Sequence, residues 1–171
     1  MTAPATISDA DLLDEVLRCY KPHCRYLTSA AVERDGDVVR GKGIMRIPES
    51  CYIDDTGHLN SVEVGICFNQ LLYQVIATIV RDGLAPEFSD WTMEDFWRRQ
   101  LPDVLIARFA CEFRRPIDAR EFHFELTVGQ VQRRRLRPDA DPLVSLDTTF
   151  RCWDDRGGAC SGAVRVAIVG S

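Results

Sequence analysis

The sequence lacks the features that mark an exported or membrane-embedded protein. Its N-terminal stretch has no basic start followed by an apolar run, which predicts that there is no export signal. Its longest apolar stretches, such as Val75 to Val80, are too short to span a bilayer, so no membrane partner is expected. Internal repeats, linkers and low-complexity segments are also missing. We therefore expect a cytoplasmic protein whose residues 1–171 form one domain.

Cysteine pairs at the spacing of a metal site or a redox motif are missing as well. Seven cysteines occur, an odd number, and no two of them form a CxxC pair. Such cysteines are expected to be reduced and mostly buried in a cytoplasmic protein. His23 beside Cys24 is the nearest approach to a metal cluster, and it lacks the further ligands that a zinc site needs. The sequence therefore predicts neither a metal site nor a cofactor.

An excess of positive charge is missing, since 26 acidic residues outnumber 21 basic ones. The formal net charge of −5 argues against general nucleic-acid binding. Between Arg98 and Arg137, however, ten arginines stand against five acidic residues. These arginines are either solvated strand faces or a docking patch for the phosphates of coenzyme A or for an acidic carrier protein.

A long helix that is apolar on nearly every side is the most informative element. From about residue 60 to 82 the apolar residues cover almost the whole helical wheel, which predicts burial on all sides. Gly83 is typical of the position that follows a helix. A shorter amphipathic helix is expected at about residues 8–20, with Ser8 as its N-cap.

Strand-like segments surround these helices. They are 26–33 and 38–47, joined by a turn at Asp35-Gly36, and then 104–113, 122–132, 143–153 and 159–169, after a second short helix near 92–101. One antiparallel sheet wrapped around one central helix satisfies this order. We therefore predict an α+β protein with the hot-dog fold. The far side of the central helix needs cover from another copy, which predicts a homodimer or larger homo-oligomer.

Polar residues gather at the start of the central helix and inside it. Asn60 and Glu63 have the spacing of a capping box, in which each side chain bonds a backbone amide of the first turn. Asn69, Gln70 and Tyr73 lie within the apolar helix, where each costs stability unless it is hydrogen-bonded. These three form either an internal network or one wall of a binding pocket.

A histidine precedes the central helix directly. His58 follows Gly57, a residue that allows close backbone approach, and the amides of the helix start can polarise a carbonyl oxygen. A lone histidine is more often a structural hydrogen-bonder, but this setting favours a catalytic role. His23 and His123 have no such setting and are interpreted as structural.

Several blocks of residues are familiar from one enzyme family. They are Cys24-Arg25-Tyr26-Leu27, Tyr52-Ile53, Thr56-Gly57-His58 and Cys67-Phe68-Asn69-Gln70-Leu71. Through them nearly the whole chain resembles the mycobacterial long-chain fatty-acyl thioesterases. That family includes the glycine-adding enzymes of isonitrile lipopeptide biosynthesis, which act on enoyl groups held by acyl carrier protein.

The resemblance implies a homodimeric hot-dog protein with acyl thioester sites near the dimer interface. It places the active-site tyrosines at Tyr20 and Tyr52 and the active-site asparagines at Asn60 and Asn69. Asn60 therefore has two predicted roles, capping and catalysis, which do not exclude each other.

Three functions stay open at this point. Hydrolysis of an acyl thioester needs a base or a carboxylate nucleophile, and Asn69 at mid-helix cannot act as either, which leaves Glu63. Addition of glycine to a 2-enoyl thioester instead needs donors for the carbonyl oxygen, a base for the ammonium and a cation for the carboxylate. The third function is a non-catalytic acyl-binding module.

Glycine addition is the preferred hypothesis, giving a 3-(carboxymethylamino)acyl thioester on acyl carrier protein or coenzyme A. The backbone at Gly57 and the side chain of Asn69 are the expected donors, and His58, with Glu63 or a tyrosine hydroxyl, is the expected base. Arg25 is the candidate cation. The substrate-binding residues also include Tyr73, Phe68 and Leu72, of which the last two either line an acyl tunnel or pack the core.

Overall fold

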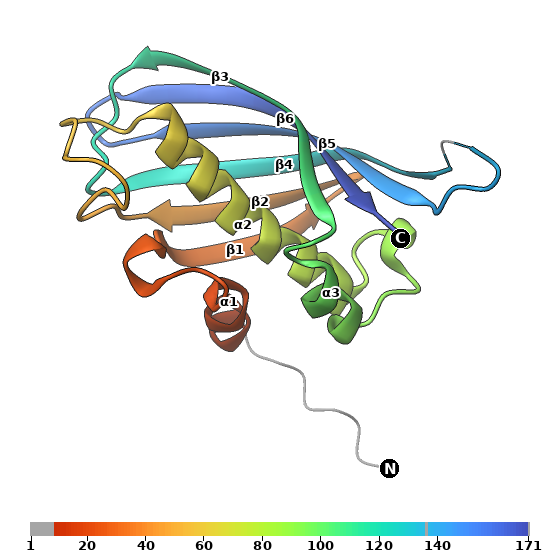
Figure 1. Ribbon diagram of the computed structural model, residues 1–171. Coiled ribbons are helices and arrows are strands. Elements are labelled where there is room, and N and C mark those ends of the chain that lie inside the picture. Colours follow the sequence, from red (N-terminus) through yellow and green to blue (C-terminus); the bar gives the residue numbers. More distant parts are fainter. Residues whose placement is uncertain (1–8, 136, 171) are drawn as a thin grey trace.

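A computed structural model of the chain, which describes residues 9–135 and 137–170, places helix α2 (Ser61–Asp82) across the concave face of a six-stranded antiparallel sheet (Figure 1). Ser8, the predicted N-cap of the first helix, lies outside the described residues. The sheet curves around α2, because twisted strands enclose one side of a helix. This arrangement confirms the predicted α+β hot-dog fold.

Strand β3 lies at one edge of the sheet, although it directly follows the helices in the chain. The strands are β1 (Leu27–Asp35), β2 (Val38–Met45), β3 (Val104–Arg115), β4 (Phe122–Arg134), β5 (Leu143–Trp153) and β6 (Ala159–Val169), in the order β1-β2-β4-β5-β6-β3. The other elements are α1 (Asp9–Leu17), α3 (Met93–Arg99) and the short 3-10 helices Pro22–Cys24 and Pro86–Phe88. The return from α2 to the far edge brings the end of β3 beside the start of α2 (Figure 1).

Helix α2 forms the centre of the core. It has the length and mean hydropathy of a membrane-crossing helix, but 78% of that stretch is buried inside the protein, as expected of a core helix. Within one chain the burial is incomplete, because one stripe at its start is not covered; for the far side of this helix the sequence predicts cover from another copy. Val62 is 51% exposed, and Ile66 and Asn69 are half-buried. These residues share one helix face because they recur every three to four positions.

Two glycines of β2 let the helix approach the sheet closely. A Cβ atom at Gly41 would lie 2.4 Å from Val75 Cγ2 of α2, which is shorter than any real contact. A Cβ atom at Gly43 would lie 2.5 Å from Leu27 Cδ1. Gly41 therefore lets α2 lie close to the sheet, and Gly43 leaves room for Leu27 of the neighbouring strand.

The outer face of the sheet carries paired charges. Arg151 bonds Glu125 at 3.0 Å, and Arg165 bonds Asp147 at 2.8 Å, in each case across neighbouring strands. Exposed pairs of this kind contribute only about 0–1 kcal/mol each. They show that these strand arginines belong to a solvated face.

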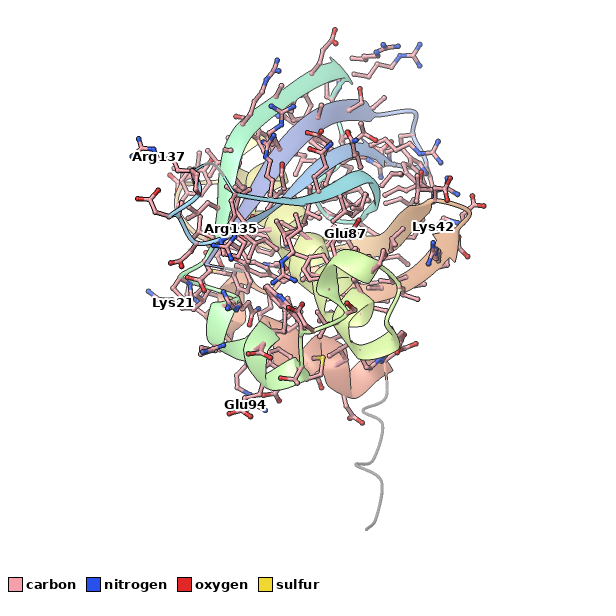
Figure 2. The ribbon with its side chains drawn as sticks, turned by 90° about the vertical axis from the view of Figure 1, so that its right-hand side faces the viewer. Lys21, Lys42, Glu87, Glu94, Arg135 and Arg137 are labelled. Atoms are coloured by element: carbon pink, nitrogen blue, oxygen red, sulfur yellow. The ribbon has the colours of Figure 1, made fainter. Side chains whose placement is uncertain are left out.

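The arginine-rich segment 98–137 does not form one patch. Figure 2 views the molecule from the end where α2 terminates, and Arg135 and Arg137 lie at that end. Arg114 and Arg115 lie at the end of β3, beside the start of α2. Only part of this segment can therefore contact one bound molecule.

Candidate active site

Asn60 caps helix α2 with its side-chain oxygen. Oδ1 of Asn60 accepts hydrogen bonds from the backbone amides of Val62 at 3.0 Å and Glu63 at 3.1 Å, and from the hydroxyl of Tyr52 at 2.8 Å. Oε2 of Glu63 accepts from the Asn60 amide at 3.3 Å, which completes the predicted capping box. The capping prediction is confirmed.

The other half of the same amide group is left free to donate. Since three donors occupy Oδ1, the orientation of the Asn60 side chain is determined. Its Nδ2 atom is buried and has no hydrogen-bond partner among the described residues. A buried donor without a partner costs stability, and it is suited to bind an oxygen atom of a ligand. Capping and ligand binding are therefore compatible at this residue.

A cavity of about 480 Å³ lies beside this cap. It is lined by His58, Leu59, Asn60 and Ser61 from the loop before α2 and by Phe113, Arg114, Arg115 and Pro116 from the end of β3. The lining is largely apolar, and its polar residues are His58, Asn60, Ser61, Arg114 and Arg115. A cavity of this size and character suits an acyl thioester.

His58 has a determined tautomer in its neutral form. Its Nδ1 atom lies 3.0 Å from the carbonyl oxygen of Leu59, and a carbonyl only accepts, so Nδ1 carries the hydrogen. The Nε2 atom then keeps a free lone pair. This nitrogen is the one available as a base on the exposed side of the loop.

The loop before α2 is held by its own hydrogen bonds. Gly57 adopts a φ of 76°, a conformation that favours glycine, and its amide donates to Asp55 Oδ1 at 2.8 Å. Asp55 in turn pairs with Arg120 at 2.6 Å. A Cβ atom at Gly57 would have nothing within 4 Å, so there is room for a larger residue. Glycine is favoured here because of the backbone conformation.

A second group of predicted site residues lies farther along α2. The rings of Tyr20 and Tyr73 are 6.4 Å apart, and Asn69 lies one helical turn before Tyr73. Arg25 contacts this group through Nε, which donates to the carbonyl of Tyr20 at 3.1 Å. Burial, and then the neighbouring Tyr73, raise the pKa of Tyr20 well above its usual value. Both tyrosine hydroxyls are thus donors at neutral pH and not bases.

The two groups are separated within one chain. Asn60 and Asn69 are nine residues apart, which corresponds to about 13 Å along the helix axis. The structure therefore brings Tyr52, Gly57, His58, Asn60 and Glu63 together, and it places Tyr20, Arg25, Asn69 and Tyr73 in another group.

Comparison with known proteins identifies the family. The model of the FcoT-like thioesterase domain matches residues 15–168, which is nearly the whole chain. The chain belongs to the FcoT-like thioesterase family.

Relatives of this FcoT-like chain share one name. A protein of Streptomyces coeruleorubidus, named (2E)-enoyl-ACP glycyltransferase, is 49% identical over 163 residues, covering 95% of this chain and 98% of that protein. Proteins of the same name from Mycobacterium marinum (37% identical, 98% and 90% covered) and Mycobacterium tuberculosis H37Rv (35% identical, 93% and 86% covered) are also similar.

The fold has a solved counterpart. The putative thioesterase yhdA of Lactococcus lactis superposes with a TM-score of 0.52 at 9% identity, covering 84% of this chain and 91% of that one. At that identity the likeness shows the fold alone.

Three buried side chains of the FcoT-like core have structural contacts. Phe68 is fully buried, with its ring 5.8 Å from that of Phe109, and Leu72 is fully buried as well, so a role for either in an acyl tunnel stays a prediction. Gln70 accepts from the amides of Tyr26 and Leu27, both at 2.9 Å. The internal-network interpretation is thus correct for Gln70, whereas Asn69 has no hydrogen-bond partner among the described residues.

Sequence reasoning missed the wall of the cavity that β3 supplies. No role is predicted from the sequence for Phe113 and Pro116, and Arg114 and Arg115 are considered only as part of the arginine-rich segment 98–137, as solvated residues or a docking patch. The available signal was two successive arginines directly after the strand predicted at 104–113. Of the described residues, no group of three or more His, Cys, Asp or Glu is placed to hold a metal ion.

Proposed function

We propose that this protein adds glycine to the β carbon of a 2-enoyl thioester on acyl carrier protein (ACP), giving a 3-(carboxymethylamino)acyl thioester. The observation that carries the proposal is the 49% identity, over 98% of its length, to a relative named (2E)-enoyl-ACP glycyltransferase. The substrates are then enoyl-ACP and glycine. The phosphopantetheine arm arrives with the substrate, and the addition requires no cofactor.

The reaction is a conjugate addition in which no atom is oxidised or reduced. A base takes one proton from the glycine ammonium, and the amine lone pair forms a bond to C3 of the enoyl chain. The C2–C3 π electrons move toward the thioester carbonyl, whose oxygen gains negative charge. A proton delivered to C2 then completes the product. Donors that point at this oxygen lower the barrier most.

The cavity beside α2 holds groups for two of these tasks. Asn60 Nδ2, buried and without a partner among the described residues, is suited to donate to the thioester oxygen. The positive end of the helix dipole lies at the same place and favours negative charge there. His58 Nε2 carries the free lone pair that a base for the glycine ammonium needs. Tyr52 acts on Asn60 by holding its oxygen.

A homodimer is part of the proposal. Edge strand β3 exposes Leu105 (47%) and Ile106 (39%), and an exposed apolar edge favours pairing with another strand. The exposed stripe of α2 that begins at Val62 also needs cover. A symmetric dimer through β3 would bury both surfaces. It would also close the cavity, because the end of β3 forms one of its walls.

The test follows the carrier by intact-mass spectrometry. The protein is incubated with a short 2-enoyl-ACP and isotope-labelled glycine. Label on the carrier-bound chain, lost in the variants His58→Ala and Tyr52→Phe, is the expected result. Free acid without label means hydrolysis, and an unchanged carrier means a binding module. Either of these two outcomes refutes glycine addition.

Hydrolysis is the second candidate because the family model describes a thioesterase and one carboxylate lies near the cavity. That carboxylate is Glu63, which is 3% exposed and bonded to the Asn60 amide. A base must reach the water that it activates, and this carboxylate is engaged in the capping box. The geometry therefore favours addition over hydrolysis.

A further inference from the structure

We infer that Arg114 and Arg115 form the subsite that holds the carboxylate of glycine. This inference rests on the proposed function, since it names the residues that select the amine substrate. An enzyme that uses glycine must distinguish it from other small amines. The carboxylate is the group that differs, and a guanidinium matches it in charge and in planar geometry.

Arg25, the cation expected from the sequence, lies in the wrong group for this role. Its Nε donates to the carbonyl of Tyr20 at 3.1 Å, and its Nη2 is 3.5 Å from the carbonyl of Arg18. It does not line the cavity beside Asn60. An amine that attacks a thioester bound at Asn60 therefore needs a different counter-ion.

Arg114 and Arg115 both line that cavity. Other arginines at this end of the molecule are neutralised, because Arg120 pairs with Asp55 at 2.6 Å and Arg156 pairs with Asp118 at 3.1 Å. Arg114 and Arg115 form no ion pair with any carboxylate of the described residues. Both arginines are exposed and thus leave unpaired positive charge beside a largely apolar cavity, where it can attract a carboxylate.

A β-bulge explains how two successive residues reach one cavity. Successive side chains of a strand normally point to opposite faces of the sheet. The register of β3 on β6 shifts between Phe113, opposite Cys160, and Arg115, opposite Ala159, which leaves Arg114 as the extra residue. A bulge re-aims side chains in this way and is common beside binding sites. The bulge therefore accounts for two successive residues of β3 that both line the cavity beside Asn60.

The geometry separates the tasks of the two walls. The wall before α2 offers Asn60 Nδ2 to the thioester and His58 Nε2 to the ammonium. The β3 wall offers cations to the carboxylate. Glycine held between them has its nitrogen directed to the enoyl chain, which is the positioning that accelerates a two-substrate reaction.

The test compares glycine with glycinamide, an amine of nearly the same size that has no carboxylate. Both are assayed with the same 2-enoyl-ACP, using wild-type protein and the Arg114→Gln, Arg115→Gln and double variants. We expect the double variant to lower kcat/KM for glycine by about 10- to 150-fold, the loss of one charge-assisted contact. The kcat/KM for glycinamide and the KM for enoyl-ACP should change by less than about threefold. Glycinamide has no carboxylate for these arginines to bind, and we expect them not to contact the enoyl-ACP. The single variants show which guanidinium carries the larger share.

Arg134→Gln is the matched control. Arg134 is an exposed arginine near the opposite end of the sheet, and it forms no ion pair with the described residues either. It should leave both substrates unaffected, and thermal unfolding should show that all variants are folded.

Three outcomes are decisive. An equal loss for glycine and glycinamide overturns the subsite, and so does a raised KM for enoyl-ACP with unchanged amine preference, which would assign the arginines to the carrier phosphate. If the wild-type protein adds no glycine to any enoyl thioester, the proposed function itself fails and the subsite fails with it.

Discussion

Asn60 combines a structural and a catalytic role, and two substitutions separate them. Asn60→Ser keeps an N-cap, because a serine oxygen accepts from the same amides as Asn60 Oδ1 does. It removes the free Nδ2 donor. Asn60→Ala removes both the cap and the donor.

The expected magnitudes differ between stability and rate. Loss of an N-cap costs about 0.5–2 kcal/mol, and in a protein of this size each 1 kcal/mol lowers Tm by about 2–4 °C. We therefore expect Asn60→Ala to melt a few degrees lower and Asn60→Ser to melt close to wild type. Loss of a donor to a developing oxyanion lowers kcat by about 10²–10³-fold. Both variants should show this loss.

Thermal unfolding and the labelled-glycine assay measure the two effects on the same samples. The reasoning is refuted if Asn60→Ser adds glycine at the wild-type rate, since Nδ2 would then have no role in the reaction. Equal destabilisation in Asn60→Ser and Asn60→Ala would instead show that the loss of the Tyr52 contact dominates the stability of this loop.

Three further predictions concern other residues. Glu63→Gln keeps the capping geometry, so glycine addition should stay within about threefold of wild type if His58 is the base; a loss of 10²-fold or more would make Glu63 the base. Ile106→Glu should convert a dimer into a monomer with lower activity, as measured by light scattering, whereas Thr149→Glu on the outer face of β5 should not; a monomeric wild-type protein would contradict the proposed interface. The pKa of Tyr20 is higher in the folded protein than the usual phenol pKa of 10.0, so the unfolded chain loses this proton first. The contribution of Tyr20 to the free energy of unfolding is therefore fully present below pH 10.0 and is lost as the pH rises above it. Tyr20→Phe should therefore lose less stability than wild type in urea unfolding between about pH 8 and 11, and an equal loss would show that other groups cause the alkaline effect.

Much of the fold could be predicted because the patterns that encode it are local. The apolar stretch before Gly83 indicated the central helix, and Asn60 with Glu63 indicated its first turn. The sequence predicts that the far side of this helix needs cover from another copy, but it does not predict that Val62 is exposed and Asn69 half-buried within one chain. A helical wheel shows which residues of a helix are apolar. It does not show which of them are buried by other elements of the same chain.

The site was predicted in part. Tyr52, His58 and Asn60 were selected by resemblance and by their place before the helix, and the structure gathers them at one end of α2. Asn69 was assigned to the same reaction, but the rise of the helix separates it from Asn60 by about 13 Å. Asn69 can therefore act in the same reaction as Asn60 only if the bound substrate extends over that distance or if a second copy of the chain brings its own Asn69 close.

The sequence by itself determined the central helix, its cap and the polar loop before it, because neighbouring residues decide these features through backbone hydrogen bonds and side-chain spacing. Only the tertiary structure decided that Arg114 and Arg115 line the same cavity as Asn60. That arrangement depends on β3 pairing with β6 at the sheet edge and on the bulge in their register. Both are set by contacts between residues far apart in the chain, and no local pattern of residues encodes them.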